Sequence, residues 1–134
     1  ETISRMKRKG LVEFKMHNGR NLPRLTKKGE DEARRVALGE TIIKKPLRWD
    51  RKWRIVIFDI PEKRKGLRER VRKLVSNMGF FRLQDSVWVF PYDCEEIVAL
   101  LKLDLKIGRE LIYIIADAIE FDTPLRQHFK LPLD

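Results

Sequence analysis

The chain has 134 residues and 43% of them are hydrophobic, so it can form one ordinary domain, or one small domain and part of another, and wholesale disorder is excluded. No apolar run approaches the roughly 20 residues that cross a bilayer, which excludes a membrane span. The single cysteine, Cys94, excludes an intramolecular disulfide and a multi-cysteine zinc cage. With no recognisable secretory leader, we expect a cytoplasmic protein.

Charge is unevenly distributed along the chain. Thirty Lys and Arg against twenty Asp and Glu give a net charge of +10. Residues 1–52 contain 16 basic and 7 acidic residues, or +9, whereas residues 53–134 contribute only +1. A clustered positive charge attracts polyanions, so double-stranded DNA is the expected partner. The alternative is a solvated basic surface without a partner.

The first 39 residues predict the order helix, strand, strand, helix. Val12, Phe14 and Met16 alternate with charged residues, which is typical of a half-buried strand. Asn18-Gly19 then predicts a tight hairpin turn. The expected elements are a helix end over 2–9 stopped by Gly10, strands over 11–16 and 22–25, and a helix over 26–38 that Thr26 caps and Gly39 ends.

Residues 40–52 show no sustained periodicity. Five Lys and Arg side chains lie in this stretch, and Pro46 disfavours a helix at the residue before it. We therefore predict a basic linker here rather than a folded element.

From residue 53 onward the predicted order is strand, helix, strand, strand, helix, strand. Leu67, Val71 and Leu74 recur at helical spacing. Asp93, with Glu96 three residues later, matches a capping box. The elements are strands over 53–60, 80–84, 86–90 and 110–119, and helices over 65–78 and from 93 to about 106, the second ended by Gly108. This is an α+β, ferredoxin-like β-α-β-β-α-β arrangement, and the sheet face that the helices leave bare favours a homodimer.

Two strings in the first 39 residues resemble parts of a winged helix-turn-helix domain. Ile3 to Val12 (ISRMKRKGLV) is similar to the end of a recognition helix, and Leu25 to Gly29 (LTKKG) to the exit from the wing. The resemblance implies a partial winged helix, or winged-helix remnant, over 1–39. Its expected DNA-binding residues are Arg5, Lys7, Arg8 and Lys9 at the helix end, and Lys15, His17, Asn18 and Arg20 on the wing.

Residues 53–119 resemble the small adaptation endonuclease of CRISPR systems, the second Cas protein. They are more similar still to the C-terminal part of PaaX-type transcriptional repressors. The strings that carry the resemblance are Ile57 to Glu62 (IFDIPE), Gly79 to Arg82 (GFFR) and Leu83 to Val89 (LQDSVWV). A winged helix ahead of such a domain is the arrangement expected of the PaaX type. The resemblance implies a ferredoxin-like, CRISPR-adaptation-endonuclease-like domain over 53–134 that joins two copies.

Asp59 lies at the C-terminal end of the first predicted strand of this domain, in a position similar to the endonuclease family's metal-binding aspartate. That resemblance implies a catalytic Asp59 that meets its counterpart across a dimer axis and holds Mg²⁺, which activates water against a phosphodiester. The alternative is a carboxylate that ends a strand and accepts hydrogen bonds. One carboxylate per chain makes a weak metal site, which favours the alternative.

Five further residues are carried over from the resemblance. The family places basic residues near the dimer cleft at the positions of Lys63, Arg64 and Arg82. These side chains could bind phosphate or could simply be solvated at the surface, and the sequence favours neither role. Ser86 and Trp88 are structural matches, because the serine has no partner base and the tryptophan lies between two valines.

The leading interpretation is a DNA-binding, PaaX-like transcriptional regulator that dimerises and needs no cofactor to bind DNA. The alternative is a Mg²⁺-dependent nuclease, or a non-catalytic DNA-holding subunit related to the CRISPR endonuclease. For the regulator, the resemblance suggests a small acyl-thioester inducer, but no residue marks a pocket for one.

Overall fold

A computed structural model describes residues 1–40 and 43–134, and residues 41 and 42 of the predicted linker lie outside the described residues. The chain forms two compact units. The described residues of the first unit are 1–40 and 94–109, and the second unit comprises Ile43–Asp93 and Glu110–Asp134.

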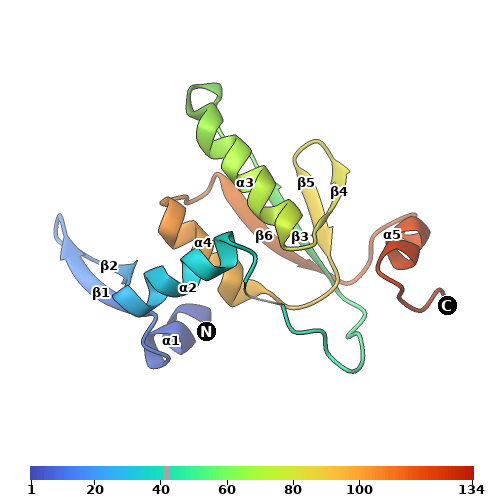
Figure 1. Ribbon diagram of the computed structural model, residues 1–134, viewed down its shortest axis with the longest axis horizontal. Helices are drawn as coiled ribbons and strands as arrows, with labels where there is room; N and C mark the ends of the chain where they lie inside the picture. The colour runs from blue at the N-terminus through green and yellow to red at the C-terminus, as the bar shows by residue number, and fades with distance from the viewer. Residues whose placement is uncertain (41–42) are drawn as a thin grey trace. The chain divides into compact units, whose positions relative to one another are not determined.

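The first unit contains a hairpin between two helices. Its elements are α1 (Thr2–Arg8), β1 (Val12–His17), β2 (Arg20–Leu25), α2 (Lys27–Ala37) and α4 (Glu95–Leu105) (Figure 1). Strands β1 and β2 pair antiparallel, with His17 opposite Arg20. The turn residues Asn18 and Gly19 have φ of 50° and 78°, the signs that a two-residue primed turn needs. The predicted hairpin is therefore confirmed.

Helix α2 begins where the sequence predicts. The Thr26 hydroxyl oxygen accepts a hydrogen bond from the Gly29 N–H at 3.1 Å, as an N-cap should. A side chain at Gly29 would meet the Leu11 carbonyl oxygen at 2.1 Å, so only glycine allows the helix to approach the start of the hairpin. Met6, Val12 and Leu100 belong to the buried cluster that joins α1, the hairpin and α4.

Three sequence expectations in this unit are wrong in detail. Strand β1 buries only Val12, while Met16 is 63% exposed, because β1 and β2 form a two-stranded sheet whose far end extends beyond the core. Helix α4 has Cys94 rather than Asp93 as its N-cap, without a side-chain capping bond. It ends at Lys106, whose φ of 55° makes the left-handed cap that was expected at Gly108.

The second unit is built on a four-stranded antiparallel sheet in the order β4-β5-β3-β6. Its elements are β3 (Trp53–Phe58), a 3₁₀ turn over Glu62–Arg64, α3 (Lys65–Asn77), β4 (Phe81–Gln84), β5 (Val87–Phe90), β6 (Leu111–Ala116) and α5 (Thr123–His128). With α4, the order from β3 to β6 is β-α-β-β-α-β, which agrees with the predicted ferredoxin-like order and confirms the α+β class.

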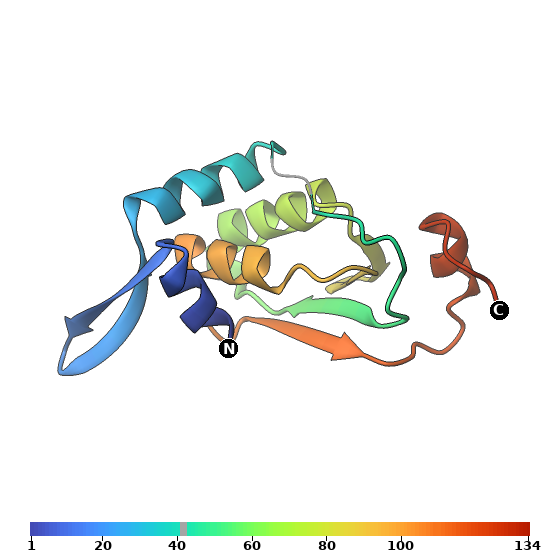
Figure 2. The same cartoon turned by 90° about the horizontal axis from the view of Figure 1, so that it is seen from below.

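One face of this sheet is covered and the other is partly open. Helix α3 lies along one face (Figure 2), and Val71, Leu74 and Val75 are its buried residues. Val56 and Phe58 of β3 are 0% and 2% exposed. Strand alternation places the half-buried Ile55 and Ile57 on the opposite face.

The C-terminal part differs from the sequence expectation. Strand β6 ends at Ala116 rather than at residue 119, and helix α5, which the sequence did not predict, follows. Across residues 1–40 and 43–134, none of the helices combines the length and apolar character that a membrane span requires.

Candidate nucleic-acid interface

The cations expected at the end of α1 divide into two kinds. Glu96 of α4 pairs with Lys9 at 2.9 Å and with Arg5 at 3.4 Å. Burial opposes ionisation of Glu96, but the hydrogen bonds and positive charges of Lys9 and Arg5 outweigh it and lower its pKa. Lys7 and Arg8 are exposed and form no ion pair with a residue that the structure describes. The Lys7 ammonium instead lies 5.4 Å from the centre of the Phe14 ring.

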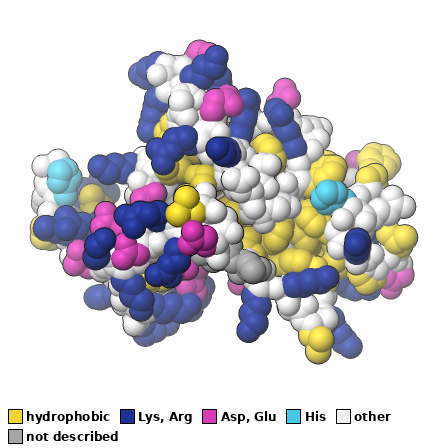
Figure 3. All heavy atoms as spheres, viewed as in Figure 1, with side chains coloured by type: hydrophobic (Ala, Val, Ile, Leu, Met, Phe, Trp, Pro, Cys, Tyr) yellow, Lys and Arg dark blue, Asp and Glu magenta, His cyan; other side chains and the backbone are white. Residues whose placement is uncertain are grey.

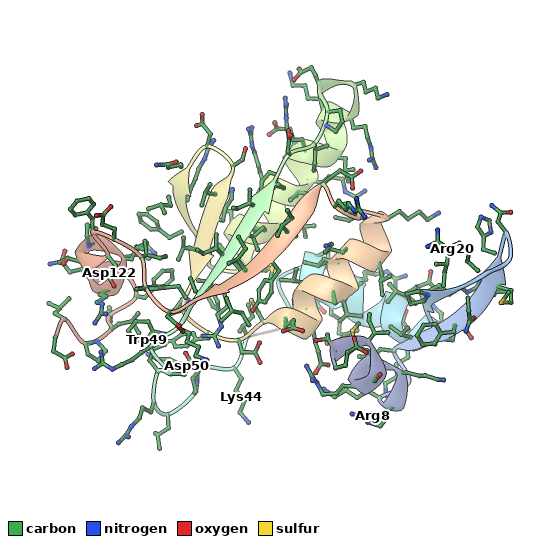
Figure 4. The ribbon with its side chains drawn as sticks, turned by 180° about the vertical axis from the view of Figure 1, so that it is seen from behind. Arg8, Arg20, Lys44, Trp49, Asp50 and Asp122 are labelled. Carbon is green, nitrogen blue, oxygen red and sulfur yellow. The ribbon has the colours of Figure 1, made fainter. Side chains whose placement is uncertain are left out.

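The four candidate residues of the hairpin lie together near its turn. Lys15, His17, Asn18 and Arg20 are all exposed, and the strand register sets His17 beside Arg20. Further along, Arg24 is paired across the strands with Glu13 at 3.4 Å. Figure 4 labels Arg20 on this hairpin and Arg8 on α1. The cations at the turn therefore carry no intramolecular counter-ion among the described residues.

Helix α2 has many charges but balances them internally. Asp31 accepts from Lys27 at 3.1 Å and from Arg34 at 3.0 Å, and Glu32 pairs with Arg35 at 2.8 Å. Figure 3 shows acidic and basic side chains mixed on the part of the first unit that faces the viewer. The exposed cations of this unit that form no ion pair with a described residue include Lys7, Arg8, and Lys15 and Arg20 near the hairpin turn, together with Lys28, Lys106 and Arg109 elsewhere in the unit.

Asp59 lies directly after β3 in the second unit. Its backbone N–H donates to the Glu110 carbonyl oxygen at 2.8 Å, and its side chain is exposed. The neighbouring Phe58 N–H donates to the Ser86 carbonyl oxygen at 3.3 Å, which brings Ser86 to the same end of the sheet. Within the described parts of the chain, no group of three or more His, Cys, Asp or Glu side chains could hold a metal ion.

The family-matched basic residues of the second unit have different surroundings. Arg64 pairs with Glu110 at 3.0 Å, while Lys63 is exposed. Arg82 donates to the Asp85 carboxylate at 3.4 Å and lies 5.7 Å from the centre of the Trp88 ring. Trp88 itself is only 7% exposed. Two of these three cations are therefore engaged within the chain.

The partners of the α1 cations could not be predicted from the sequence. Glu96 was expected to cap α4, whereas it binds Lys9 and Arg5, 87 and 91 residues away along the chain. Local spacing contains no signal for such a contact. The acidic pair Glu95-Glu96 lies in the first turn of α4, where the helix dipole favours carboxylates. Its presence is therefore explained without a distant partner.

Comparison with known protein families identifies the family of this chain. Residues 46–127 match the family model described as the PaaX protein central Cas2-like domain. No curated protein matches the chain. The matched segment begins in the predicted linker, spans the four-stranded sheet and ends in α5.

Proposed function

The chain belongs to the PaaX family, and on that premise we propose that it is a DNA-binding transcriptional regulator. In this proposal the first unit contacts duplex DNA as part of a winged helix, and the second unit joins two copies. Binding to DNA requires no cofactor. An inducer of the acyl-thioester class belongs to the same proposal.

The exposed cations of the β1–β2 hairpin carry the DNA-binding part of the proposal. These cations are Lys15 and Arg20, which lie with His17 near a tight turn and have no carboxylate paired to them among the described residues. Backbone phosphates are the natural counter-ions for such a group, and phosphate contacts position a protein without reading its sequence. The hairpin therefore supports affinity for duplex DNA and does not define an operator.

The test is a salt titration of DNA binding with the double variant Lys15→Gln, Arg20→Gln. Each phosphate contact contributes about −0.9 to the slope of log affinity against log salt concentration. We therefore expect the slope of the variant to be shallower than that of the wild type by about 1 to 2. Arg70→Gln with Lys73→Gln removes the same charge from exposed positions on α3 and serves as the control. Absence of any DNA binding by the wild-type chain at low salt would refute the proposal.

A second candidate, a Mg²⁺-dependent nuclease, rests on the exposed carboxylate of Asp59 at the end of β3. A single carboxylate supplies too few ligands by itself, so this function needs a second Asp59 from another copy. Cleavage of DNA or RNA that requires Mg²⁺ and disappears in Asp59→Ala would establish it. DNA binding without cleavage, unchanged in that variant, favours the regulator.

A further inference from the structure

Residues 43–52 are anchored within the second unit although they form no helix or strand. Trp49 is 8% exposed, and its indole Nε1 donates to the Pro91 carbonyl at 2.9 Å and to the Lys52 carbonyl at 3.0 Å. Its ring packs edge-on against Trp53 with 5.0 Å between centres. The loop is therefore fixed by a buried aromatic side chain.

An ion pair beside Trp49 holds the next turn of the loop. The two Asp50 carboxylate oxygens accept from the Arg54 guanidinium at 2.6 and 2.9 Å. Arg54 is 5% exposed and also donates to the Pro91 carbonyl at 2.9 Å. The hydrogen bond from Arg54 is the main reason that the pKa of Asp50 lies below its usual value. These bonds fix the direction in which the loop enters β3.

The C-terminal segment closes the same region. Arg51 donates to both carboxylate oxygens of Asp134, at 3.1 and 3.2 Å. Arg126 of α5 donates to the carbonyls of Pro132 and Asp134, and its guanidinium lies 5.2 Å from the centre of the Trp49 ring. In Figure 4, Trp49 lies between the loop and this C-terminal segment.

Besides the exposed Leu47 and the ion-paired Arg51, this anchored loop exposes cations that the fold does not neutralise. None of them forms an ion pair with a residue that the structure describes, whereas Asp50 and Asp134 are taken up by Arg54 and Arg51. Figure 4 shows Lys44 pointing away from the sheet. Lys130 lies next to this loop, in the same pocket lining as Lys45 and Arg48. The exposed set is Lys44, Lys45, Arg48, Lys52 and Lys130.

The loop and the C-terminal segment form an open pocket of about 430 Å³ with a basic rim. Its buried walls are Trp49, Tyr92 and Leu131. Lys45, Arg48 and Lys130 lie at its exposed edge, and no carboxylate is among its lining residues. A shallow, half-open cationic surface suits a continuous polyanion that passes over it, because each phosphate keeps part of its hydration while it approaches a cation.

We propose that this anchored basic loop, with Lys130, is a second DNA-contact surface that binds backbone phosphates of duplex DNA independently of the β1–β2 hairpin. The inference rests on the proposed DNA-binding function and adds a contact within the Cas2-like unit. Because Trp49 and the Asp50–Arg54 pair hold the loop before DNA arrives, binding costs little additional ordering. Phosphate contacts carry no sequence information, so the surface strengthens binding to all duplexes alike.

The test compares two triple variants of the full chain in salt titrations with a short mixed-sequence duplex. Lys45→Gln, Arg48→Gln, Lys130→Gln removes three loop cations, and we expect the slope of log affinity against log salt to fall by about 2 to 3. Lys65→Gln, Arg70→Gln, Lys73→Gln removes three exposed α3 cations and is expected to leave the slope within about 1 of the wild type. All six side chains are exposed, and circular dichroism checks that each variant is folded.

Each outcome has a separate meaning. A loop variant that keeps the wild-type slope, or changes only as much as the α3 control, overturns the inference, even if the hairpin variant loses affinity. A loop variant that weakens single-stranded RNA of equal length but not the duplex also overturns it, in favour of an RNA surface. If the wild-type chain binds no duplex at low salt, the proposed function itself fails.

Discussion

A buried arginine is the residue that most constrains the second unit. Arg54 lies on the same strand face as Val56 and Phe58, where strand alternation leads one to expect an apolar side chain. A buried charge is stable only when it is paired and hydrogen-bonded, and the two terminal nitrogens of Arg54 meet this condition through Asp50 and the carbonyls of Lys52 and Pro91, while its buried Nε has no hydrogen-bond partner among the described residues. The loop that contains Asp50 is thereby coupled to the sheet.

We predict that Asp50→Asn destabilises the protein by about 2 kcal/mol at neutral pH, because the buried Arg54 loses its counter-charge. Arg54 lowers the pKa of Asp50 in the folded state, so the stabilisation is fully present above the unfolded value, about 4, and is lost as pH falls through the folded value. Urea unfolding of wild type and variant, at neutral pH and at successively lower pH, measures the difference. It should shrink in acid, and a difference independent of pH would contradict the assigned ion pair.

At the scale of elements, the ion pairs between the end of α1 and Glu96 of α4 reduce the positive charge on the surface of the first unit. Glu96 occupies Lys9 and Arg5, the two cations of the α1 end that have a partner. The three side chains are partly exposed, so the pairs contribute at most about 1 kcal/mol to stability. Their larger effect is on charge, since one carboxylate neutralises part of a surface proposed to face DNA.

We therefore predict that Glu96→Gln binds duplex DNA about threefold to tenfold more tightly than the wild type at low salt. The free energy of unfolding of this variant should be lower by at most about 1 kcal/mol. Fluorescence anisotropy with a labelled duplex measures the affinity. Glu69→Gln, an exposed acidic residue of α3 paired with Arg72, is the matched control for a change of one charge. Weaker binding by Glu96→Gln would mean that Glu96 positions α1 for DNA rather than competing with it.

Features that depend on neighbouring residues could be predicted from the sequence, whereas features that depend on distant residues could not. The Asn18-Gly19 turn and the Thr26 cap depend on residues within a few positions, and both occur as predicted. The role of Glu96 depends on partners almost the whole chain away, so local spacing favoured a capping box instead. Helix α5 has six residues with a proline near its start, too short to show a helical period.

The same limit applies to the candidate interface. The sequence identifies which side chains are cationic, and Lys15 and Arg20 are exposed on the hairpin. It cannot show that Arg5, Lys9, Arg64 and Arg82 are occupied by carboxylates of the same chain. Nor can it show that a stretch without periodicity is anchored, because Trp49 is fixed by carbonyls of Lys52 and of the distant Pro91.

For the whole molecule, the open sheet face is the surface proposed to join two copies. Ile57 of β3 pairs in register with Ile112 of β6 on one side and Val87 of β5 on the other, and Ile55 pairs with Ile114. Residues opposite each other in a sheet share a face, so these five apolar side chains form one patch. Ile112 is 52% exposed. A contiguous apolar patch of this kind is characteristic of a protein interface.

We predict that Ile112→Glu converts a dimer into a monomer, because the variant would bury a carboxylate without a partner within the apolar contact. Ile115→Glu is the matched control, since Ile115 lies on the same strand, is 49% exposed and points to the opposite face. Light scattering after size exclusion should give about twice the 16.0 kDa chain mass for the wild type and the control, and the single chain mass for Ile112→Glu. A monomeric wild type at micromolar concentration would contradict pairing through the sheet. Loss of the dimer in Ile115→Glu alone would move the interface to the other face, where Ile115 lies opposite Arg54.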